Sequence, residues 1–74
     1  MVKLFNIKQN GNIVSFDGIG DGTECFRMAF DIHTGKNIIS TTDNCVYLSE
    51  AKFKILSCLA DGMELPSELI AVSF

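Results

Sequence analysis

The sequence carries little positive charge. Arg27 is the only arginine, and six lysines and arginines stand against nine acidic residues, so the formal net charge is −3 at pH 7. Domains that bind phosphate backbones usually have clustered lysines and arginines and a basic isoelectric point. The scarcity of cations therefore disfavours direct binding to nucleic acid.

Long apolar runs are missing too, and so is any close pair of cysteines. No stretch of about 18 apolar residues is present to cross a bilayer, and the first six residues, MVKLFN, lack the apolar core and cleavage site of a signal peptide. Cys25, Cys45 and Cys58 are odd in number and widely spaced, which predicts reduced, mostly buried thiols. We expect a cytoplasmic protein that does not enter a membrane.

The residues that are present suffice for one small domain. Hydrophobic residues make up 47% of the 74 residues, more than an intrinsically disordered chain would contain. A chain of this length buries only about 60% of the surface that its unfolded form exposes, so its core is small. We predict a single α+β domain over residues 1–74.

An Asn-Gly pair at positions 10 and 11 predicts the first β-hairpin. It separates two segments of alternating hydrophobicity, residues 4–9 and 12–16, and both turn positions tolerate a positive φ. A two-residue loop at this point fixes how the two strands align.

The predicted alignment sets Ile7 opposite Val14 and Phe5 opposite Phe16. These four side chains would lie on the core face of the sheet. Leu4 would then lie on the opposite face, because successive residues of a strand point to opposite sides.

A second hairpin follows the same logic. Its first strand carries an inward row at every second position: Phe26, Met28, Phe30 and Ile32. Gly35 suits the left-handed position of a short loop with a bulge, and residues 37–42 form the returning strand. In that alignment Phe30 faces Ile38.

The hydrophobic period then changes to that of a helix over residues 50–61. Ser49 is the predicted N-cap, and Gly62 is the predicted stop. Apolar residues cover a broad arc of this helix, which implies either deep packing or a second contact beyond the sheet.

Residues 69–74 predict a final strand after the interruption at Pro66. This strand could pair beside the first strand or the fourth, and we favour the first. The element order is β-β-β-β-α-β, a mostly antiparallel sheet with one helix packed on one face.

An acidic, glycine-rich segment, DGIGDGTE, occupies residues 17–24 and raises the question of a ligand loop. An EF-hand beginning at Asp17 would need ligands where Ile19 and Met28 stand, and its flanks look like strands. A phosphate loop would need a following helix, and three local acids would repel the ligand. We interpret the segment as a flexible connection between strands whose glycines end one strand and let the next begin; weak calcium binding stays open.

The sequence offers little for catalysis. His33 is the only histidine, and it continues a row with Cys25, Arg27 and Asp31 on the strand face opposite the core. A solvated sheet face explains that row without a reaction, and a chain this small rarely encloses a pocket. His33, Cys45 and Cys58 lack the close-spaced ligand pair of a zinc site. We therefore predict no enzyme activity, no metal and no cofactor.

Association with another protein is the function that the pattern favours. The non-core face is more apolar than solvation requires, and a domain of marginal size gains burial by dimerising or docking. The predicted interaction face comprises Leu4, Ile13, Cys25, Arg27, Asp31, His33, Ile39 and, at the end of the last strand, Phe74. The partner would be another protein or a second copy.

Two other functions stay open at this point. One is an inhibitor from a mobile element that occupies a host nucleic-acid enzyme, which would need a coherent negative patch. The other is a weak metal or small-ligand binder that uses the acidic segment or the strand row from Cys25 to His33.

The overall plan resembles a family of small proteins. The resemblance rests on the N-G turn, the motif FDIHTGK at residues 30–36 and the motif LPSEL at residues 65–69. Proteins with this pattern occur in clostridial-type, low-GC Gram-positive bacteria and their mobile elements, and they have no assigned activity. The resemblance implies a compact α+β domain and no particular chemistry.

Overall fold

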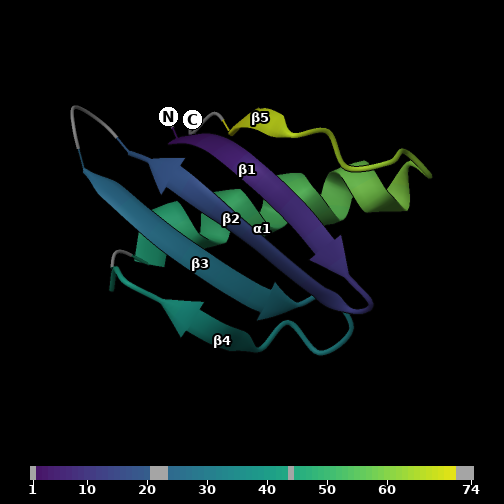
Figure 1. The fold of residues 1–74 in the computed structure, drawn as a ribbon, viewed down its shortest axis with the longest axis horizontal. Coiled ribbons are helices and arrows are strands. Elements are labelled where there is room, and N and C mark those ends of the chain that lie inside the picture. Colours follow the sequence, from purple (N-terminus) through teal and green to yellow (C-terminus); the bar gives the residue numbers. More distant parts are fainter. Residues whose placement is uncertain (1, 21–23, 44, 72–74) are drawn as a thin grey trace.

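A computed structural model describes residues 2–20, 24–43 and 45–71. Within these ranges the chain forms five strands and one helix in the predicted order (Figure 1). The elements are β1 (Val2–Asn10), β2 (Ile13–Ile19), β3 (Cys25–Asp31), β4 (Asn37–Ser40), α1 (Cys45–Ala60) and β5 (Glu68–Ala71). The predicted α+β class is confirmed.

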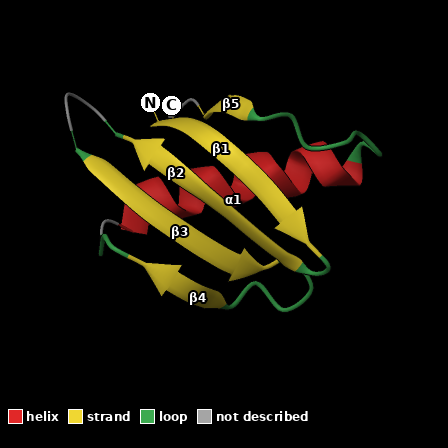
Figure 2. Cartoon of the chain, viewed as in Figure 1, coloured by secondary structure: helices red, strands yellow, loops and turns green. Residues whose placement is uncertain are grey.

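The strands form one antiparallel sheet in the order β4-β3-β2-β1-β5. β5 pairs with β1, as favoured from the sequence, and Val2 lies opposite Ala71. The helix α1 crosses one face of the sheet (Figure 2). We call the other face, which α1 does not cover, the outer face.

The turn between β1 and β2 lies one position later than predicted. Asn10 pairs with Ile13, so the two turn residues are Gly11 and Asn12. Gly11 adopts a φ of 63°, which only glycine reaches without steric cost, so the turn still depends on this glycine.

A bulge in β1 changes the alignment further along the hairpin. Asn6 has a φ of 54°, and the pairing shifts here so that Asn6 and Ile7 together oppose Phe16. Phe5 therefore lies opposite Asp17, and the predicted pairing of Phe5 with Phe16 is wrong. Asparagine tolerates the left-handed conformation better than most residues, which suits it to this position.

The bulge exchanges the two faces of β1. Leu4 is completely buried in the core, whereas Phe5 is only half-buried and shares the outer face with Asp17. The predictions that placed Phe5 in the core and Leu4 on the outer face are therefore wrong. One extra residue suffices for this exchange, because side chains alternate with a period of two.

The glycines of the acidic segment make room for aromatic rings. Gly18 lies within β2, and a Cβ atom placed on it would come 2.4 Å from Cζ of Phe26. A Cβ atom on Gly20 would come 2.3 Å from the ring of Tyr47. The rings of Phe26 and Tyr47 stack with centroids 6.0 Å apart and planes 8° apart. Gly18 therefore does not end a strand as predicted but admits the contact between β3 and α1.

The hairpin of β3 and β4 follows the prediction in part. Ala29 pairs with Ile39 in the predicted alignment, but an irregularity then sets Phe30 opposite Asn37 rather than Ile38. Gly35 has a φ of 75°, which confirms its left-handed position in the loop.

The helix begins earlier than predicted and ends as predicted. It starts at Cys45, so Ser49 lies inside α1 and is not its N-cap. At the other end Gly62 has a φ of 74°, and its N–H donates to the carbonyl of Leu59. The N–H of Met63 donates to the carbonyl of Cys58, which completes a Schellman motif.

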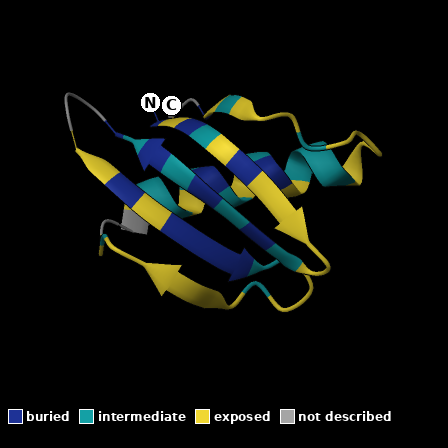
Figure 3. Cartoon of the chain, viewed as in Figure 1, coloured by how far each residue is buried: buried dark blue, intermediate teal, exposed yellow. Residues whose placement is uncertain are grey.

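The core lies between α1 and the sheet (Figure 3). Phe16 and Phe30 meet edge to face with centroids 6.4 Å apart. The buried cluster comprises Val2, Leu4, Ile7, Val14, Phe16, Phe26, Met28, Phe30, Ala51, Ile55 and Ala71. Of the residues predicted for the inward side of the first three strands, Phe5 is not in this cluster and Ile32 is only partly buried against it; the others belong to it.

Lys52 ties α1 to the loop between β3 and β4. Its Nζ donates to the carbonyl of Gly35 and, at 3.0 Å, to Oδ1 of Asn37. The same ammonium lies 5.6 Å from the centroid of the Phe30 ring, within the range of a cation–π contact. The stem of Lys52 thus covers core while its charge reaches the loop.

Candidate interaction surfaces

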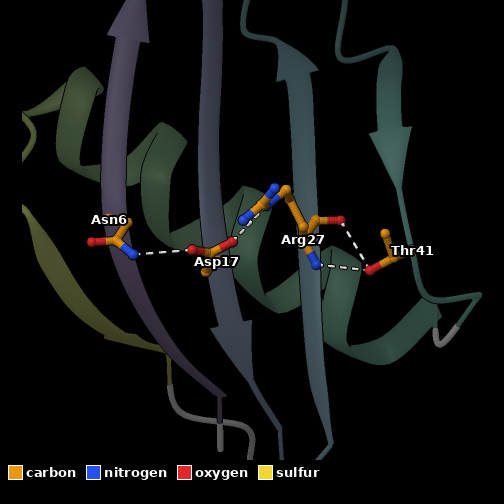
Figure 4. A network of polar contacts seen from close by, with 4 residues as sticks. All are labelled: Asn6, Asp17, Arg27 and Thr41. Atoms are coloured by element: carbon orange, nitrogen blue, oxygen red, sulfur yellow. Dashed lines mark hydrogen bonds and ion pairs between the residues drawn. The ribbon is translucent and has the colours of Figure 1, made fainter.

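Three polar side chains from three neighbouring strands meet on the outer face (Figure 4). Asn6 Nδ2 donates to Asp17 Oδ2 at 3.0 Å, and Arg27 Nε donates to Asp17 Oδ1 at 2.9 Å. Arg27 is also held through its backbone, because its N–H donates to Thr41 Oγ1 at 2.8 Å. The bulge at Asn6 is what brings the first of these side chains into the group.

The contacts stabilise the ionised form of Asp17. The hydrogen bond from Asn6, followed by the hydrogen bond and charge of Arg27, holds the pKa of this carboxyl below its ordinary value. The carboxylate in turn raises the pKa of the Arg27 guanidinium. Each Asp17 oxygen accepts one hydrogen bond, so a calcium ion bound by this carboxylate would compete with Asn6 and Arg27.

Arg27 keeps most of its hydrogen-bonding capacity. Its side chain is 70% exposed, and toward the described residues only Nε of the guanidinium makes a hydrogen bond. The Asp17 contact fixes the plane of the guanidinium, while the two terminal nitrogens remain available.

Two adjacent hollows flank Arg27 and Asp17 on this face. One has a volume of about 450 Å³ and is polar, lined among others by Asn6, Lys8 and Ser15. The other has a volume of about 320 Å³, and its lining includes Phe5 and Cys25. The cations Arg27 and Lys8 together outnumber the single carboxylate of the first hollow.

The structure places the predicted interaction residues in several environments. On the outer face Ile13 is half-buried, while Cys25, Arg27 and Ile39 are exposed. The exposure of Cys25 agrees with its predicted place on the face opposite the core, although the cysteines as a group were predicted to be mostly buried. Leu4 belongs to the core, as described above, and Phe74 lies outside the described residues.

Asp31 ends β3 opposite Ile13, as predicted for the row, whereas His33 lies in the turn that follows. Asp31 Oδ1 accepts hydrogen bonds from the N–H groups of His33 and Thr34, at 2.7 and 3.1 Å, so it shapes the loop after β3. The length of β3 separates Cys25 from His33 by about 20 Å or more. These two residues therefore cannot form a catalytic pair within one chain.

The described residues contain no group of three or more histidine, cysteine or acidic side chains placed to hold a metal ion. Positions 21–23 of the acidic segment lie outside those residues. Cys58 is half-buried on α1.

The solvent side of α1 carries a row of uncharged residues, which we call the solvent stripe. It comprises Val46, Ser49, Phe53, Leu56 and Ala60 and continues past the helix end with Met63. The spacing of three and four residues keeps all of them on one side of a helix. Phe53 is 75% exposed, and Val46 and Met63 are each 58% exposed.

The stripe resolves the alternatives left by the broad apolar arc. Ala51 and Ile55 are completely buried against the sheet, whereas Phe53 and Leu56 face away from it. The arc is therefore two apolar surfaces, one covered and one open. Val46 was not predicted as part of this surface, because the predicted helix begins after that residue.

No helix in the described part of the chain is long and apolar enough to cross a membrane. Neither a family of proteins, nor a curated protein, nor a solved structure was found to match the chain. The resemblance to small proteins of low-GC Gram-positive bacteria thus stays a prediction.

Proposed function

We propose that this chain is a protein-interaction domain that associates with a second copy of itself through the solvent stripe of α1. The observation that carries the proposal is the exposure of Phe53, which is 75% accessible near the middle of an uncharged helix side. Covering such a side chain with another apolar surface removes it from water and so lowers the free energy.

The rest of α1 explains why a contact is needed. A surface helix normally has charged residues opposite its apolar side, whereas the charged residues of α1, Glu50, Lys52 and Lys54, lie outside the solvent stripe. α1 is apolar toward the sheet at Ala51 and Ile55 and apolar toward solvent at Phe53 and Leu56. A second partner on the solvent side would give it the environment that its composition favours.

The exposed area fits a modest dimer. From their exposed fractions, the four large apolar side chains of the stripe offer roughly 450 Å² per copy, at the upper range of patches that monomers leave open. A standard interface removes about 800 Å² from each partner. The stripe and its rim would therefore form an interface at the small end of the range of interface areas, for which we expect a dissociation constant of about 10–100 μM.

Charge does not oppose a second copy at the solvent stripe. Each chain has a net charge of −3, so two copies repel wherever their acidic surfaces approach. The stripe has no charged residue from Val46 to Met63 along one side, so two copies can meet there without opposing charges. A two-fold arrangement lets the same residues serve both partners.

Sedimentation equilibrium between 5 μM and 1 mM tests the proposal with two matched variants. Phe53→Glu and Ile39→Glu each replace an exposed apolar residue by a negative charge, and Ile39 is 52% exposed on β4. We expect the wild type and Ile39→Glu to dimerise alike and Phe53→Glu to remain monomeric at 1 mM. Circular dichroism confirms that each variant is folded.

The opposite result would overturn the assignment. A wild type that is monomeric throughout this range contradicts self-association. Loss of the dimer in Ile39→Glu but not in Phe53→Glu would show that the dimer contact lies on the outer face, as predicted from the sequence.

The structure gives less support to an inhibitor of a nucleic-acid enzyme. Such a protein would present a coherent negative surface, whereas on the outer face Asp17 and Glu68 alternate with Lys3 and Arg27. Mixed charge of this kind does not imitate a phosphate backbone.

A further inference from the structure

We infer that the outer face binds a small organic monocarboxylate, with the carboxylate on the terminal nitrogens of Arg27 and an apolar chain against Phe5. This site is independent of the solvent stripe, because α1 covers the opposite side of the sheet. Its parts are an oriented guanidinium, a second cation and two hollows of different polarity.

The orientation of Arg27 is the first part. Nε is bound to Asp17 at 2.9 Å, and the backbone of Arg27 is bound to Thr41 through both its N–H and its carbonyl. A guanidinium held at Nε presents its two terminal nitrogens as a planar fork, and such a fork matches the two oxygens of a carboxylate. Less side-chain entropy is lost on binding than for a freely rotating arginine.

The charge balance is the second part and selects a monoanion. Arg27 and Lys8 line the polar hollow with the single carboxylate of Asp17, so these three groups sum to one positive charge within a negative protein. One carboxylate would neutralise that charge. A dianionic phosphate would bring excess negative charge beside Asp17, so the site favours carboxylate.

The two hollows are the third part. They share Arg27 and Asp17, and their volumes of about 450 and 320 Å³ lie within or near the range of small-ligand sites. The lining of the smaller hollow includes Phe5, Gly18 and Phe26. A short alkyl chain attached to the carboxylate can lie there against the Phe5 ring.

The backbone at Asn6 agrees with a binding role. A left-handed asparagine in a strand is uncommon, and such conformations and bulges occur preferentially where side chains are directed at a site. At this position the bulge both directs Asn6 to Asp17 and turns Phe5 to the outer face. One backbone feature therefore builds both the polar and the apolar part.

Titration followed by amide resonances of the ¹⁵N-labelled protein tests the inference with three probes. Hexanoate is the proposed class, hexanamide is its uncharged analogue, and inorganic phosphate reports general attraction of anions. We expect hexanoate to shift the amides of Phe5, Asp17 and Arg27 in a saturable way. Hexanamide and phosphate should bind at least tenfold more weakly.

Variants of single residues identify the groups responsible. Arg27→Lys keeps the charge but removes the fork, and we expect it to weaken hexanoate binding about tenfold. Phe5→Ala should weaken hexanoate severalfold and leave acetate unchanged. Lys36→Gln, which removes a positive charge from an exposed residue that lines neither hollow, should have no effect.

Several results would overturn the inference. Equal affinity for hexanoate and hexanamide would exclude recognition of the carboxylate. Equal weakening of hexanoate binding by Lys36→Gln and Arg27→Lys would show that binding does not depend on the Arg27 fork. Absence of saturable shifts near Arg27 at 50 mM hexanoate would exclude the site, while the amide spectrum itself shows whether each variant is folded.

Discussion

The two faces of the sheet differ in what covers them and in how their side chains interact. The face toward α1 is apolar, and Phe16, Met28 and Phe30 are almost completely buried there. No helix of the described ranges lies over the outer face, whose middle carries the hydrogen bonds around Asp17. The same strands supply both faces, so the difference depends entirely on which residues of each strand point which way.

The composition of both sheet faces depends on one extra residue in β1. Without the bulge at Asn6, Leu4 and Ile7 would point to opposite sides, because their positions differ by three, an odd number. With it, both are buried in the core, and Phe5 joins the outer face. A local change in the backbone thus decides the composition of two surfaces.

The largest expected effect comes from truncating Leu4, by comparison with its neighbour Phe5 on the opposite face of β1. Leu4→Ala should lower the free energy of unfolding by about 3 kcal/mol, because Leu4 is completely buried and the truncation leaves a cavity. Phe5→Ala should cost only about 1 kcal/mol, since Phe5 is half-buried on an open face. Urea denaturation of both variants measures the difference. A larger cost for Phe5→Ala would show that Phe5, rather than Leu4, lies in the core.

Adding a single methyl group to the covered face should have the next largest effect. Gly18→Ala places a Cβ atom 2.4 Å from the Phe26 ring, so either the strand or the stack with Tyr47 must move. We expect a loss of about 2 kcal/mol. The control Ser15→Ala, on the outer face, should change stability by less than about 0.5 kcal/mol. A Gly18→Ala protein as stable as this control would contradict the close packing described for the glycine.

The smallest effect concerns the polar group on the outer face and appears in acid. The pKa of Asp17 is lower in the folded protein than its ordinary value of 3.8, so its ionisation stabilises the fold above that pH. This contribution is lost as the pH falls below about 4 and through the folded-state value, and for such an exposed pair it amounts to a few tenths of a kcal/mol. Unfolding measured from pH 2.5 to 7 should therefore converge for the wild type and Asp17→Asn in acid. Parallel curves over the whole range would show that the carboxylate contributes nothing.

Much of the fold follows from local patterns in the sequence. Alternation identified Phe16, Phe26, Met28 and Phe30 as one buried set because β2 and β3 pair without interruption. The glycine stop of α1 was also predictable, since Gly62 occupies a position that requires a positive φ.

The remaining features depend on tertiary contacts that a pattern does not contain. Asn6 takes its left-handed conformation where its side chain reaches Asp17, which lies 11 residues away. The first turn of α1 contains Val46 and Tyr47, residue types that local preference assigns more readily to strands, yet Tyr47 is held by stacking on Phe26. The exposure of Arg27 was predictable from alternation, whereas its fixed orientation was not.

The pairing of β1 with β5 has a practical consequence for observing the protein fold. Lys3 and Ile70 are 67 positions apart, yet they are directly paired and both are exposed on the outer face. The unfolded chain would have a radius of gyration of about 26 Å, against 11.1 Å for the folded one. A pair of fluorescent dyes at positions 3 and 70 would therefore report the docking of β5 on β1 through a single distance, on the face of the sheet that α1 does not cover.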